Sequence, residues 1–409
     1  MAGAGAGRYL AAMTERRLKL SVLDQSPIRS GATPAQAIQE TLELARVAER
    51  LGYHRYWLAE HHNSGGLAGT TPEVLMARVA ADTRRIRVGS GGVMLSHYSA
   101  LKVAENFRML ETLYPGRIDL GIGRAPGSDQ RTARALQPGP QAYGIDNYPY
   151  QIRDLIAFLH DALPADHAHA GITANPTGPS APPVWVLGSS DQSALYAAHF
   201  GLPFSFAHFI SPEGGLAVVE AYRKYFKPSA LNDKPEVNVG ISVLCAETEE
   251  RAQFLAASRD LWVLRLRTPG HPGQIPTPEE AASFPYSAEQ RAFMRSIRQR
   301  SIVGTPDQVK ARLVQQAEVY GVNEFVCVTI AHDFAARKRS YLWSFKTANV
   351  RPAIYAGCIL SVMPLLGAQL PLALALSFLL RSNFMLLGGL QFITNFFTAA
   401  PIYFVTYKL

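Results

Sequence analysis

The feature that most constrains the fold is a regular alternation of short β-type segments with longer amphipathic segments. Such an alternation predicts a parallel sheet covered by helices. A doubly wound open sheet is the alternative, but it calls for a GxGxxG turn after the first strand, and Leu23–Pro27 reads LDQSP. The β-type segments number eight, as in a (β/α)₈ or TIM barrel. They are Lys19–Leu23, Arg55–Ala59, Ile86–Gly89, Arg117–Gly121, Val184–Leu187, Phe204–Ala207, Val237–Leu244 and Glu324–Thr329.

The expected barrel occupies residues 18–340. Barrels of this kind take roughly 250 residues or more, so a chain of 409 residues has room for one barrel and an appendage. We expect residues 1–17, which are rich in alanine and glycine, to form a disordered leader. Residues 341–409 are expected to form a separate tail.

Several expected helices begin with the same local signal, a threonine followed by a proline. Thr33 and Pro34 precede the segment Ala35–Gly52, and Thr71 and Thr305 stand before proline in the same way. A threonine side chain can accept a hydrogen bond from the free backbone N–H groups at a helix start, and proline fits the first helical position. These pairs predict three N-capped helices.

Two segments fit neither the strand nor the helix pattern. Ser128–Tyr150 and Ala165–Pro183 are rich in proline, glycine, alanine and glutamine. We interpret both as long loops in the neighbourhood of the fourth strand. Loops of this kind commonly wall the active site of a barrel enzyme.

The charge balance limits the classes of partner. The formal net charge is +8, but half of it lies in residues 341–409, which contain Lys346, Arg351, Arg381 and Lys408 and no acidic residue. The remaining residues are close to balance, which argues against nucleic-acid binding. The three cysteines lie far apart in the sequence, so neither a disulfide framework nor a zinc site is indicated and a reducing, cytoplasmic setting fits.

The second expected strand runs into the segment Ala59–Asn63 (AEHHN), which places ionisable side chains at the carboxyl end of a strand. Barrel enzymes keep their catalytic residues at that end. Neighbouring residues of a strand face opposite sides, so only one of His61 and His62 needs to point into the pocket. We interpret one histidine as a proton donor or acceptor, since imidazole titrates near neutral pH. A pair of solvated loop histidines is the alternative, and the absence of a carboxylate at helical ligand spacing disfavours a metal site.

The fourth expected strand runs into Gly121–Gly127 (GIGRAPG). The glycines permit a close approach of the backbone, and Arg124 offers a forked donor that suits a phosphate group. A tight loop with a solvated arginine is the alternative interpretation. The segment alone is therefore a weak indication of phosphate binding.

The fifth expected strand is followed by Gly188–Ser193 (GSSDQS) and then by the expected helix Ala194–Phe200. The hydroxyl groups of Ser189, Ser190 and Ser193 meet the free amides of a helix start, which together make an anion site. A plain serine N-cap without a ligand is the alternative. Three hydroxyls near one helix start favour phosphate.

A glycine pair, Gly91 and Gly92, follows the third expected strand and stands shortly before His97. Without side chains, this pair would let a flat ring lie against the backbone, so we include Gly92 among the candidate cofactor-binding residues. A tight turn explains the same pair equally well.

Taken together, these segments resemble the bacterial luciferase-like flavin monooxygenases. The resemblance is carried by Leu20–Pro27 (LSVLDQSP), Ala59–His62 (AEHH), Gly121–Arg124 (GIGR) and Ile302–Pro306 (IVGTP), which stand in consistent order within residues 18–335. The combination is far more specific than any of these motifs by itself.

The resemblance implies a luciferase-like TIM barrel that binds FMN at the carboxyl ends of its strands. Arg124, Ser189, Ser190 and Ser193 match the residues that hold the phosphate, and His61 matches the catalytic histidine. Reduced FMN from a separate flavin reductase and molecular oxygen would form a flavin hydroperoxide, which inserts one oxygen atom into an organic substrate. The flavin supplies the chemistry and the protein orients it and excludes water. The resemblance also implies a homodimer.

Two alternatives stay open at this point. Other members of the same family reduce the flavin themselves or use a deazaflavin coenzyme, which would make the chain an NAD(P)H- or deazaflavin-dependent oxidoreductase. An inactive, membrane-associated binding or scaffold protein is the alternative of a different class.

The tail contains two long uncharged segments. No charged side chain appears in Ala353–Leu380, or between Arg381 and Lys408. Each segment exceeds the roughly 20 residues that a membrane crossing needs. We therefore predict a transmembrane helical hairpin within residues 353–407, although Pro364, Gly367 and Pro371 interrupt its first half. A buried pair of core helices is the alternative, but it would leave a large apolar patch to cover.

Basic residues flank the tail and predict its orientation. By the positive-inside tendency, both ends and the barrel would lie in the cytoplasm, anchored to the inner membrane. The tail also resembles the membrane-associated domain of unknown function 2062, through Pro364–Gln369 (PLLGAQ), Leu380–Asn383 (LRSN) and Asn395–Tyr403 (NFFTAAPIY). The basic residues are Arg337, Lys338, Arg339, Lys346, Arg351 and Lys408.

Overall fold

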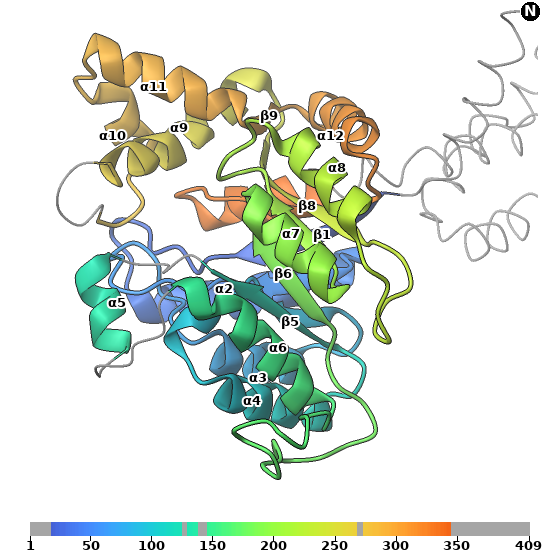
Figure 1. Ribbon diagram of the computed structural model, residues 1–409. Helices are drawn as coiled ribbons and strands as arrows, with labels where there is room; N and C mark the ends of the chain where they lie inside the picture. The colour runs from blue at the N-terminus through green and yellow to red at the C-terminus, as the bar shows by residue number, and fades with distance from the viewer. Residues whose placement is uncertain (1–17, 125–128, 138–144, 268–272, 345–409) are drawn as a thin grey trace, which may run out of the picture. The chain divides into compact units, whose positions relative to one another are not determined.

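The strands of the computed structural model form a closed parallel barrel. The structure describes residues 18–124, 129–137, 145–267 and 273–344. The barrel strands lie in the order β10, β1, β2, β3, β5, β6, β7, β8, and β8 pairs with β10, so the sheet closes on itself (Figure 1). They are β1 (Lys19–Asp24), β2 (Arg55–Leu58), β3 (Arg87–Ser90), β5 (Ile118–Gly123), β6 (Val184–Gly188), β7 (Phe204–Ala207), β8 (Val237–Cys245) and β10 (Glu324–Val328). Every predicted strand is present within two residues of its expected bounds, and the closed sheet excludes the doubly wound alternative.

Two further strands were not predicted. β4 (Val93–Met94) has two residues and pairs with the carboxyl end of β5. β9 (Ser301–Gly304) pairs with Ser242–Cys245, the carboxyl end of β8. The pairing of β7 with β8 ends at Gly240, so β9 takes the edge of β8 that β7 leaves free. Both additions lengthen the sheet at the carboxyl end of the barrel.

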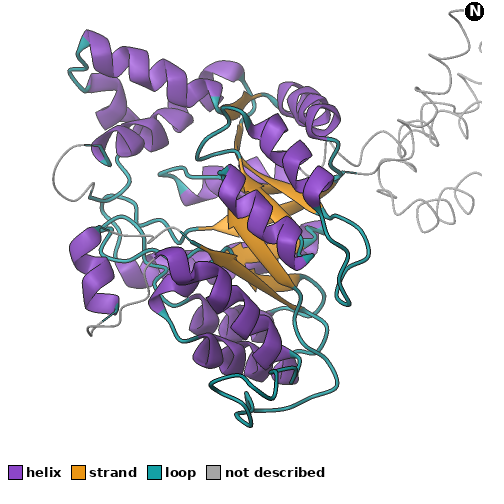
Figure 2. Cartoon of the chain, viewed as in Figure 1, coloured by secondary structure: helices purple, strands orange, loops and turns teal. Residues whose placement is uncertain are grey.

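Helices surround the barrel, as Figure 2 shows. After most strands the chain returns through one helix to the start of the next strand, and a last helix over 334–344 follows β10. α9, α10 and α11 stack into a layer of their own, which has a small core that includes Leu261, Leu264 and Phe293 (Figure 1). The helices are α2 (Pro34–Leu51), α3 (Pro72–Asp82), α4 (Ala100–Leu113), α5 (Gln130–Leu136), α6 (Tyr148–Leu159), α7 (Asp191–Phe200), α8 (Gly215–Tyr225), α9 (Glu249–Arg265), α10 (Pro278–Ser283), α11 (Ala288–Gln299) and α12 (Pro306–Tyr320), with short 3₁₀ turns at η1 (Leu95–His97) and η2 (Ile145–Asn147).

Two of the three predicted threonine caps are confirmed. Thr33 and Thr305 each accept a hydrogen bond from the backbone of a glutamine three residues on, and the glutamine side chain returns one, which makes a capping box at the start of α2 and α12. Thr71 precedes α3 as predicted but makes no side-chain cap bond. Its ψ of 81° departs from the extended conformation of the other two caps, so the predicted cap at Thr71 is wrong.

Two tryptophans fill the inside of the barrel. The rings of Trp57 on β2 and Trp185 on β6 are buried and meet edge to face, with centroids 5.5 Å apart. Gly89 on β3 makes room for Trp57, and Gly121 on β5 lets the backbone of β3 come close. A Cβ on Gly89 would lie 2.6 Å from Cδ1 of Trp57, and one on Gly121 would lie 2.1 Å from the carbonyl oxygen of Ser90. The interior is a packed core and not a channel.

A buried charge network closes the amino end of the barrel. The Arg55 guanidinium pairs with Asp119 at 3.0 Å and with Glu324 at 2.9 Å, and it lies 4.7 Å from the ring centre of Trp185. Burial by itself would lower the pKa of Arg55, but the two carboxylates raise it above its usual value. The guanidinium of Arg55 therefore stays charged in the folded protein.

The structure changes the interpretation of both long loops. Ser128–Tyr150 contains α5, whose N-cap Asp129 accepts from two backbone amides, so it is not one continuous loop. Ala165–Pro183 contains neither helix nor strand, but it connects α6 to the amino end of β6. Arg108, near the end of α4, donates to the carbonyl oxygen of Ala174 in this segment. The prediction that Ala165–Pro183 walls the active site is wrong, because helix-to-strand loops lie at the amino end of a barrel.

The predicted leader, residues 1–17, and the predicted hairpin, residues 353–407, lie outside the described residues. Within the described ranges, no helix is both long and apolar enough to cross a bilayer. Arg337 was counted among the basic residues that flank the membrane, but it is fully buried and donates to Asp24 at 2.7 Å. It belongs to the barrel because its helix, 334–344, packs that face inward.

Candidate functional site

The two histidines after β2 have different surroundings. Glu60 and His62 share one side, where Nε2 of His62 lies 2.7 Å from Oε1 of Glu60. By the alternation of side chains along an extended chain, His61 is expected on the other side, together with Ala59, which joins the inner core of the barrel. The resemblance assigned the catalytic role to His61, and that role stays a prediction.

His61 is largely buried, and its Nδ1 atom has no hydrogen-bond partner among the described residues. Its backbone is fixed by a hydrogen bond from its N–H to the carbonyl oxygen of Gly69, at 2.9 Å. Burial lowers the pKa of the His61 imidazole to about 4, and the charge of His62 acts in the same direction. At neutral pH, His61 is therefore an uncharged imidazole with one ring nitrogen available at the mouth of the barrel.

Glu60 ties three segments of the site together. Its side chain is completely buried and accepts hydrogen bonds from the backbone N–H of Met94 at 2.9 Å and from the hydroxyl of Tyr98 at 2.7 Å, besides its contact with His62. Met94 belongs to β4, and Tyr98 follows η1 directly. The carboxylate thus fixes β4 and η1 against the end of β2. Sequence reasoning quoted this glutamate only as part of a motif.

α7 begins at Asp191, three residues before the predicted start at Ala194, and a serine caps it. Ser190 is its N-cap and accepts from the backbone N–H of Ser193, and the hydroxyls of these two residues lie 3.2 Å apart. Ser189 lies in the turn between β6 and α7. A Cβ on Gly188 would lie 2.4 Å from Oγ of Ser193, so glycine lets the serine hydroxyl approach the end of β6.

Arg124 reaches this helix start. It follows β5, and its guanidinium donates to the side-chain oxygen of Gln192 in the first turn of α7. The Gln192 side chain in turn donates to the hydroxyl of Tyr196, at 2.8 Å. Arg124 and the Ser190–Ser193 pair, remote in sequence, therefore meet at one helix N-terminus, where free amides and a cation favour an anion.

Sequence reasoning missed Tyr148, which was assigned to a loop. Tyr148 opens α6, is 1% exposed, and its hydroxyl has no hydrogen-bond partner in the described part of the chain. Burial raises the pKa of this hydroxyl and the charge of nearby Arg124 opposes the rise. Its ring packs on that of Tyr196, with centroids 5.9 Å apart. The pair Tyr148-Pro149 at the start of an amphipathic segment was a usable helix signal.

Gly92 has a structural reason to be glycine. A Cβ there would lie 2.8 Å from the carbonyl oxygen of Gly121 on β5. The close approach of the two backbones explains the residue without a ligand. That a flat ring lies against it stays a prediction.

The candidate residues share one edge of the molecule. His61, Gly92, Arg124 and Ser190 each follow a strand of the same parallel barrel, so all lie at its carboxyl end. β4 links two of these segments, because Met94 is fixed by Glu60 on one side and pairs with Gly123 on the other. Arg124, the Ser190–Ser193 pair and the imidazole of His61 therefore lie at the same end of the barrel. Within the described residues, no cluster of histidine, cysteine and carboxylate side chains could hold a metal ion.

Comparison with known proteins decides the family. A family profile described as luciferase-like monooxygenase matches residues 18–324. The chain is also 39% identical over 329 residues to the luciferase-like monooxygenase of Escherichia coli (strain K12), covering 80% of this chain and 96% of that protein. The chain belongs to the luciferase-like monooxygenase family.

This luciferase-like monooxygenase has a characterised relative in Bacillus subtilis (strain 168), an N-acetyl-S-alkylcysteine monooxygenase, 36% identical over 324 residues that cover 79% of this chain and 96% of the relative. The crystal structure of apo-MsnO8 matches the present chain with a TM-score of 0.71 and 38% identity, over 81% of this chain and 98% of that one. A second profile, described as an uncharacterized protein conserved in bacteria (DUF2062), matches residues 335–409. Both predicted resemblances are confirmed.

More distant relatives of this luciferase-like monooxygenase differ in cofactor. An oxygenating constituent of 3,6-diketocamphane monooxygenase from Pseudomonas putida, solved with FMN, has a TM-score of 0.59 and 19% identity, over 81% of this chain and 97% of that one. An F420-dependent secondary alcohol dehydrogenase has a TM-score of 0.60 and 13% identity, over 81% and 99%. The similarity to these two structures shows a shared fold and carries no conclusion about the cofactor of this chain. The oxygenase component of a flavin-dependent trigonelline monooxygenase of Acinetobacter baylyi is 24% identical over 315 residues, covering 72% of this chain and 83% of that protein.

Proposed function

We propose that this chain is an FMN-dependent monooxygenase that uses reduced FMN and molecular oxygen to insert one oxygen atom into a small organic substrate. The observation that carries the proposal is the meeting of Arg124 with the N-terminus of α7 at the same barrel edge as His61. The monooxygenase relatives support the reaction class, and the oxygenase component supports a separate flavin reductase as partner.

The residues at the start of α7 fit a flavin phosphate. Arg124 supplies a charged forked donor, and Ser189, Ser190 and Ser193 supply hydroxyls at a helix N-terminus. The buried hydroxyl of Tyr148 beside Arg124 supplies a further donor that the protein itself does not use in its described part. A bound phosphate would satisfy this donor.

His61 would accept or donate a proton during the reaction. Reduced FMN, when bound, supplies the electrons that activate oxygen. The uncharged imidazole accepts a proton at its free ring nitrogen, and its low pKa keeps it in that form throughout the neutral range. Glu60 contacts His62, whereas Nδ1 of His61 has no partner within the described residues.

Binding of FMN to the purified full chain tests the cofactor. We expect oxidised and reduced FMN to bind with one site per chain, and Arg124→Gln to weaken that binding by roughly a hundredfold, since charge-assisted hydrogen bonds to a phosphate contribute strongly. Arg131→Gln, an exposed arginine of α5, is the control and should leave the affinity unchanged. Equal affinities of all three proteins would contradict the site.

Rapid mixing with oxygen tests the reaction class. Reduced FMN bound to the wild-type chain should return to the oxidised spectrum through a distinct transient, and His61→Gln should alter the lifetime of that transient while FMN still binds. Direct oxidation with no transient in either protein would contradict oxygen activation and leave the flavin site in place.

A deazaflavin-dependent oxidoreductase is the second candidate, because the F420-dependent dehydrogenase shares the barrel. A titration with coenzyme F420 beside FMN separates the two. Tighter binding of F420 than of FMN by the same chain would select this alternative. The homodimer stays a prediction and requires a mass measurement in solution.

The membrane anchor is a separate proposal that rests on the two uncharged segments within residues 353–407. We expect the full chain to sediment with inner membranes and to resist extraction by alkaline carbonate, while a chain that ends at Ser344 stays in the supernatant. Recovery of both chains in the supernatant would contradict the anchor.

A further inference from the structure

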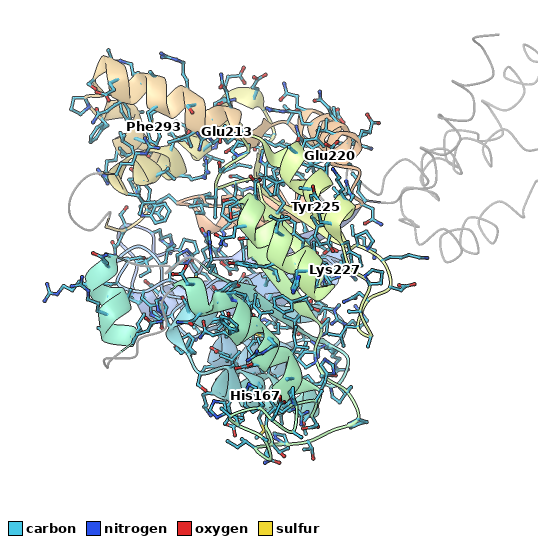
Figure 3. All side chains as sticks on the ribbon, viewed as in Figure 1. His167, Glu213, Glu220, Tyr225, Lys227 and Phe293 are labelled. Carbon is cyan, nitrogen blue, oxygen red and sulfur yellow. The ribbon has the colours of Figure 1, made fainter. Side chains whose placement is uncertain are left out.

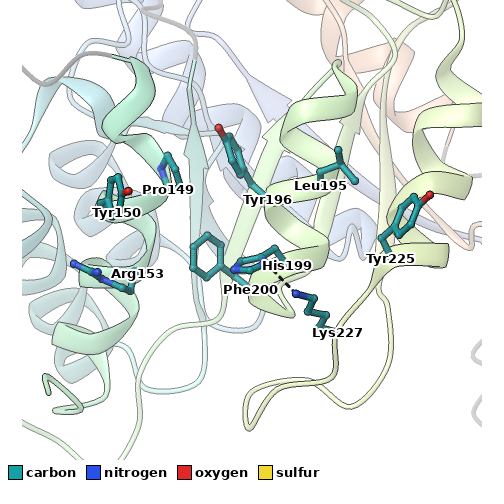
Figure 4. Close-up of a pocket in the computed structure, with 9 residues that line it drawn as sticks. All are labelled: Pro149, Tyr150, Arg153, Leu195, Tyr196, His199, Phe200, Tyr225 and Lys227. Atoms are coloured by element: carbon teal, nitrogen blue, oxygen red, sulfur yellow. Dashed lines mark hydrogen bonds between the residues drawn. The ribbon is translucent and has the colours of Figure 1, made fainter.

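A cavity lies on the outer surface of the barrel, between α6, α7 and the end of α8 (Figure 4). Its volume is about 590 Å³, which falls within the roughly 300–1,000 Å³ of small-molecule sites. Tyr225 ends α8 and Lys227 follows it closely, as the overview of side chains in Figure 3 also shows. None of the predicted cofactor residues lines this groove.

Several large apolar side chains that line the groove are exposed. Tyr150 on α6 is 59% exposed, Leu195 on α7 is 43% exposed, and Tyr225 on α8 is 54% exposed. Phe200 and Tyr196 lie between them in the groove (Figure 4). Single exposed apolar residues are ordinary, but a cluster around one concave surface is typical of a binding site.

The charged residues of the groove are all basic. Its lining includes Arg153, His199 and Lys227 and no carboxylate. Arg153 is already paired with Asp154 at 2.8 Å. The Lys227 ammonium lies 3.3 Å from Nδ1 of His199, and no ion pair of Lys227 occurs in the described ranges of the chain. One exposed cation therefore stands beside an apolar surface without a counter-charge.

The groove adjoins the candidate phosphate site but is distinct from it. The ring of Tyr196 lines the groove, while its hydroxyl accepts from Gln192, the residue that also binds Arg124. The Gln192 side chain therefore separates the two sites. A ligand in the groove would touch the outer side of α7 and would not occupy the mouth of the barrel.

We propose that this groove binds a small amphiphilic anion, with an aromatic body against Tyr196, Phe200 and Leu195 and one carboxylate or sulfonate at Lys227. Complementarity selects this class, since the surface offers apolar area and one unpaired positive charge. The volume suits one free small molecule. The proposal does not depend on the identity of the flavin.

Calorimetric titration of the full chain with naphthalene-2-sulfonate tests the site. We expect one binding site, weaker binding of the uncharged naphthalene-2-sulfonamide, and a loss of roughly fivefold in sulfonate affinity for Lys227→Gln, the size expected of an exposed ion pair. Lys234→Gln, an exposed lysine outside the groove, should bind as the wild type does. Equal affinities of the sulfonate and the sulfonamide would overturn the proposal.

Two further variants locate the bound probe. Leu195→Glu places a negative charge in the groove and should abolish sulfonate binding, while Leu216→Glu, at a similarly exposed leucine of α8 outside the groove, should not. His61→Gln should leave the affinity unchanged. If His61→Gln weakened binding and Leu195→Glu did not, the sulfonate would lie in the barrel mouth and the proposal would be wrong.

Discussion

At the scale of single residues, His61 and His62 are neighbours in sequence with opposite surroundings. His62 contacts the buried carboxylate of Glu60, whereas His61 is buried without a partner for its Nδ1 atom within the described residues. Both residues follow β2 in a segment without regular secondary structure, so the difference comes from the contacts that surround each ring.

The low pKa of His61 predicts an acid-dependent loss of stability. Its folded pKa of about 4 lies below the usual 6.5, so the unfolded chain binds a proton in this window and the folded chain does not. Stability is therefore unaffected above pH 6.5 and falls as the pH drops toward 4. At pH 5, His61 should cost on the order of 2 kcal/mol. His61→Gln should show a smaller drop in thermal midpoint between pH 8 and pH 5 than the wild type.

His208 is the internal reference for this measurement. Its pKa is also lowered to about 4 by burial, so part of the acid sensitivity should persist in His61→Gln. The double variant His61→Gln/His208→Gln should reduce the drop further. An unchanged drop in both variants would show that neither imidazole is buried as described.

Glu60→Gln should destabilise the site strongly. The carboxylate accepts three hydrogen bonds, and an amide leaves at least one of these donors facing an NH₂ group. A buried donor without an acceptor costs about 1–3 kcal/mol. Glu43→Gln, which removes the largely exposed partner of Lys338, should cost below about 1 kcal/mol. Comparable unfolding free energies for the two variants would argue against the role of Glu60.

Residue-level function was only partly predictable from the sequence. Arg124 and the serines of the Gly188–Ser193 segment follow strands in recognisable motifs, so their place at the carboxyl edge could be derived. Tyr148 could not be derived, because its surroundings come from Arg124 and Tyr196, which reach it only through the fold. The resemblance gave His61 as the catalytic histidine, but the contact between His62 and Glu60 became visible only in the structure.

At the scale of elements, the start of α7 combines a helix cap with a candidate phosphate site. Ser190→Ala should therefore lose two things, about 1 kcal/mol of stability from the cap and roughly tenfold in FMN affinity. Thr248→Ala removes the equivalent cap of α9, a helix that contains none of the candidate flavin residues, and should lose stability alone. Unfolding and FMN titration of both variants separate the effects. Equal FMN affinities would reduce Ser190 to a plain cap.

Elements with a strong sequence signal were predicted well and short ones were missed. The barrel strands are β-branched or apolar segments between helical segments, which is a signal that their own residues contain. β4 has two residues and β9 four, and both exist because a neighbouring strand leaves an edge free. Such pairing depends on the rest of the sheet. The misplaced loop Ala165–Pro183 has the same origin, since composition does not tell which end of a barrel a loop joins.

At the scale of the whole molecule, the barrel depends on small residues that face large ones. Gly89→Ala should destabilise the protein by about 1–3 kcal/mol, because the new methyl group would overlap Trp57. Gly178→Ala is the control, since its nearest neighbour would be 4.0 Å away. Adding Trp57→Phe to Gly89→Ala should cost less than the sum of the two single changes. Strict additivity in urea unfolding would exclude the overlap.

Trp57 and Trp185 fill the inside of the barrel and the Arg55 network closes its amino end, so the barrel has no passage from one end to the other. A ligand therefore cannot pass through the barrel, and a flavin or substrate bound at the carboxyl end must enter and leave from that end. For the proposed reaction we expect ordered binding, in which the flavin binds before the substrate and is exchanged only between turnovers.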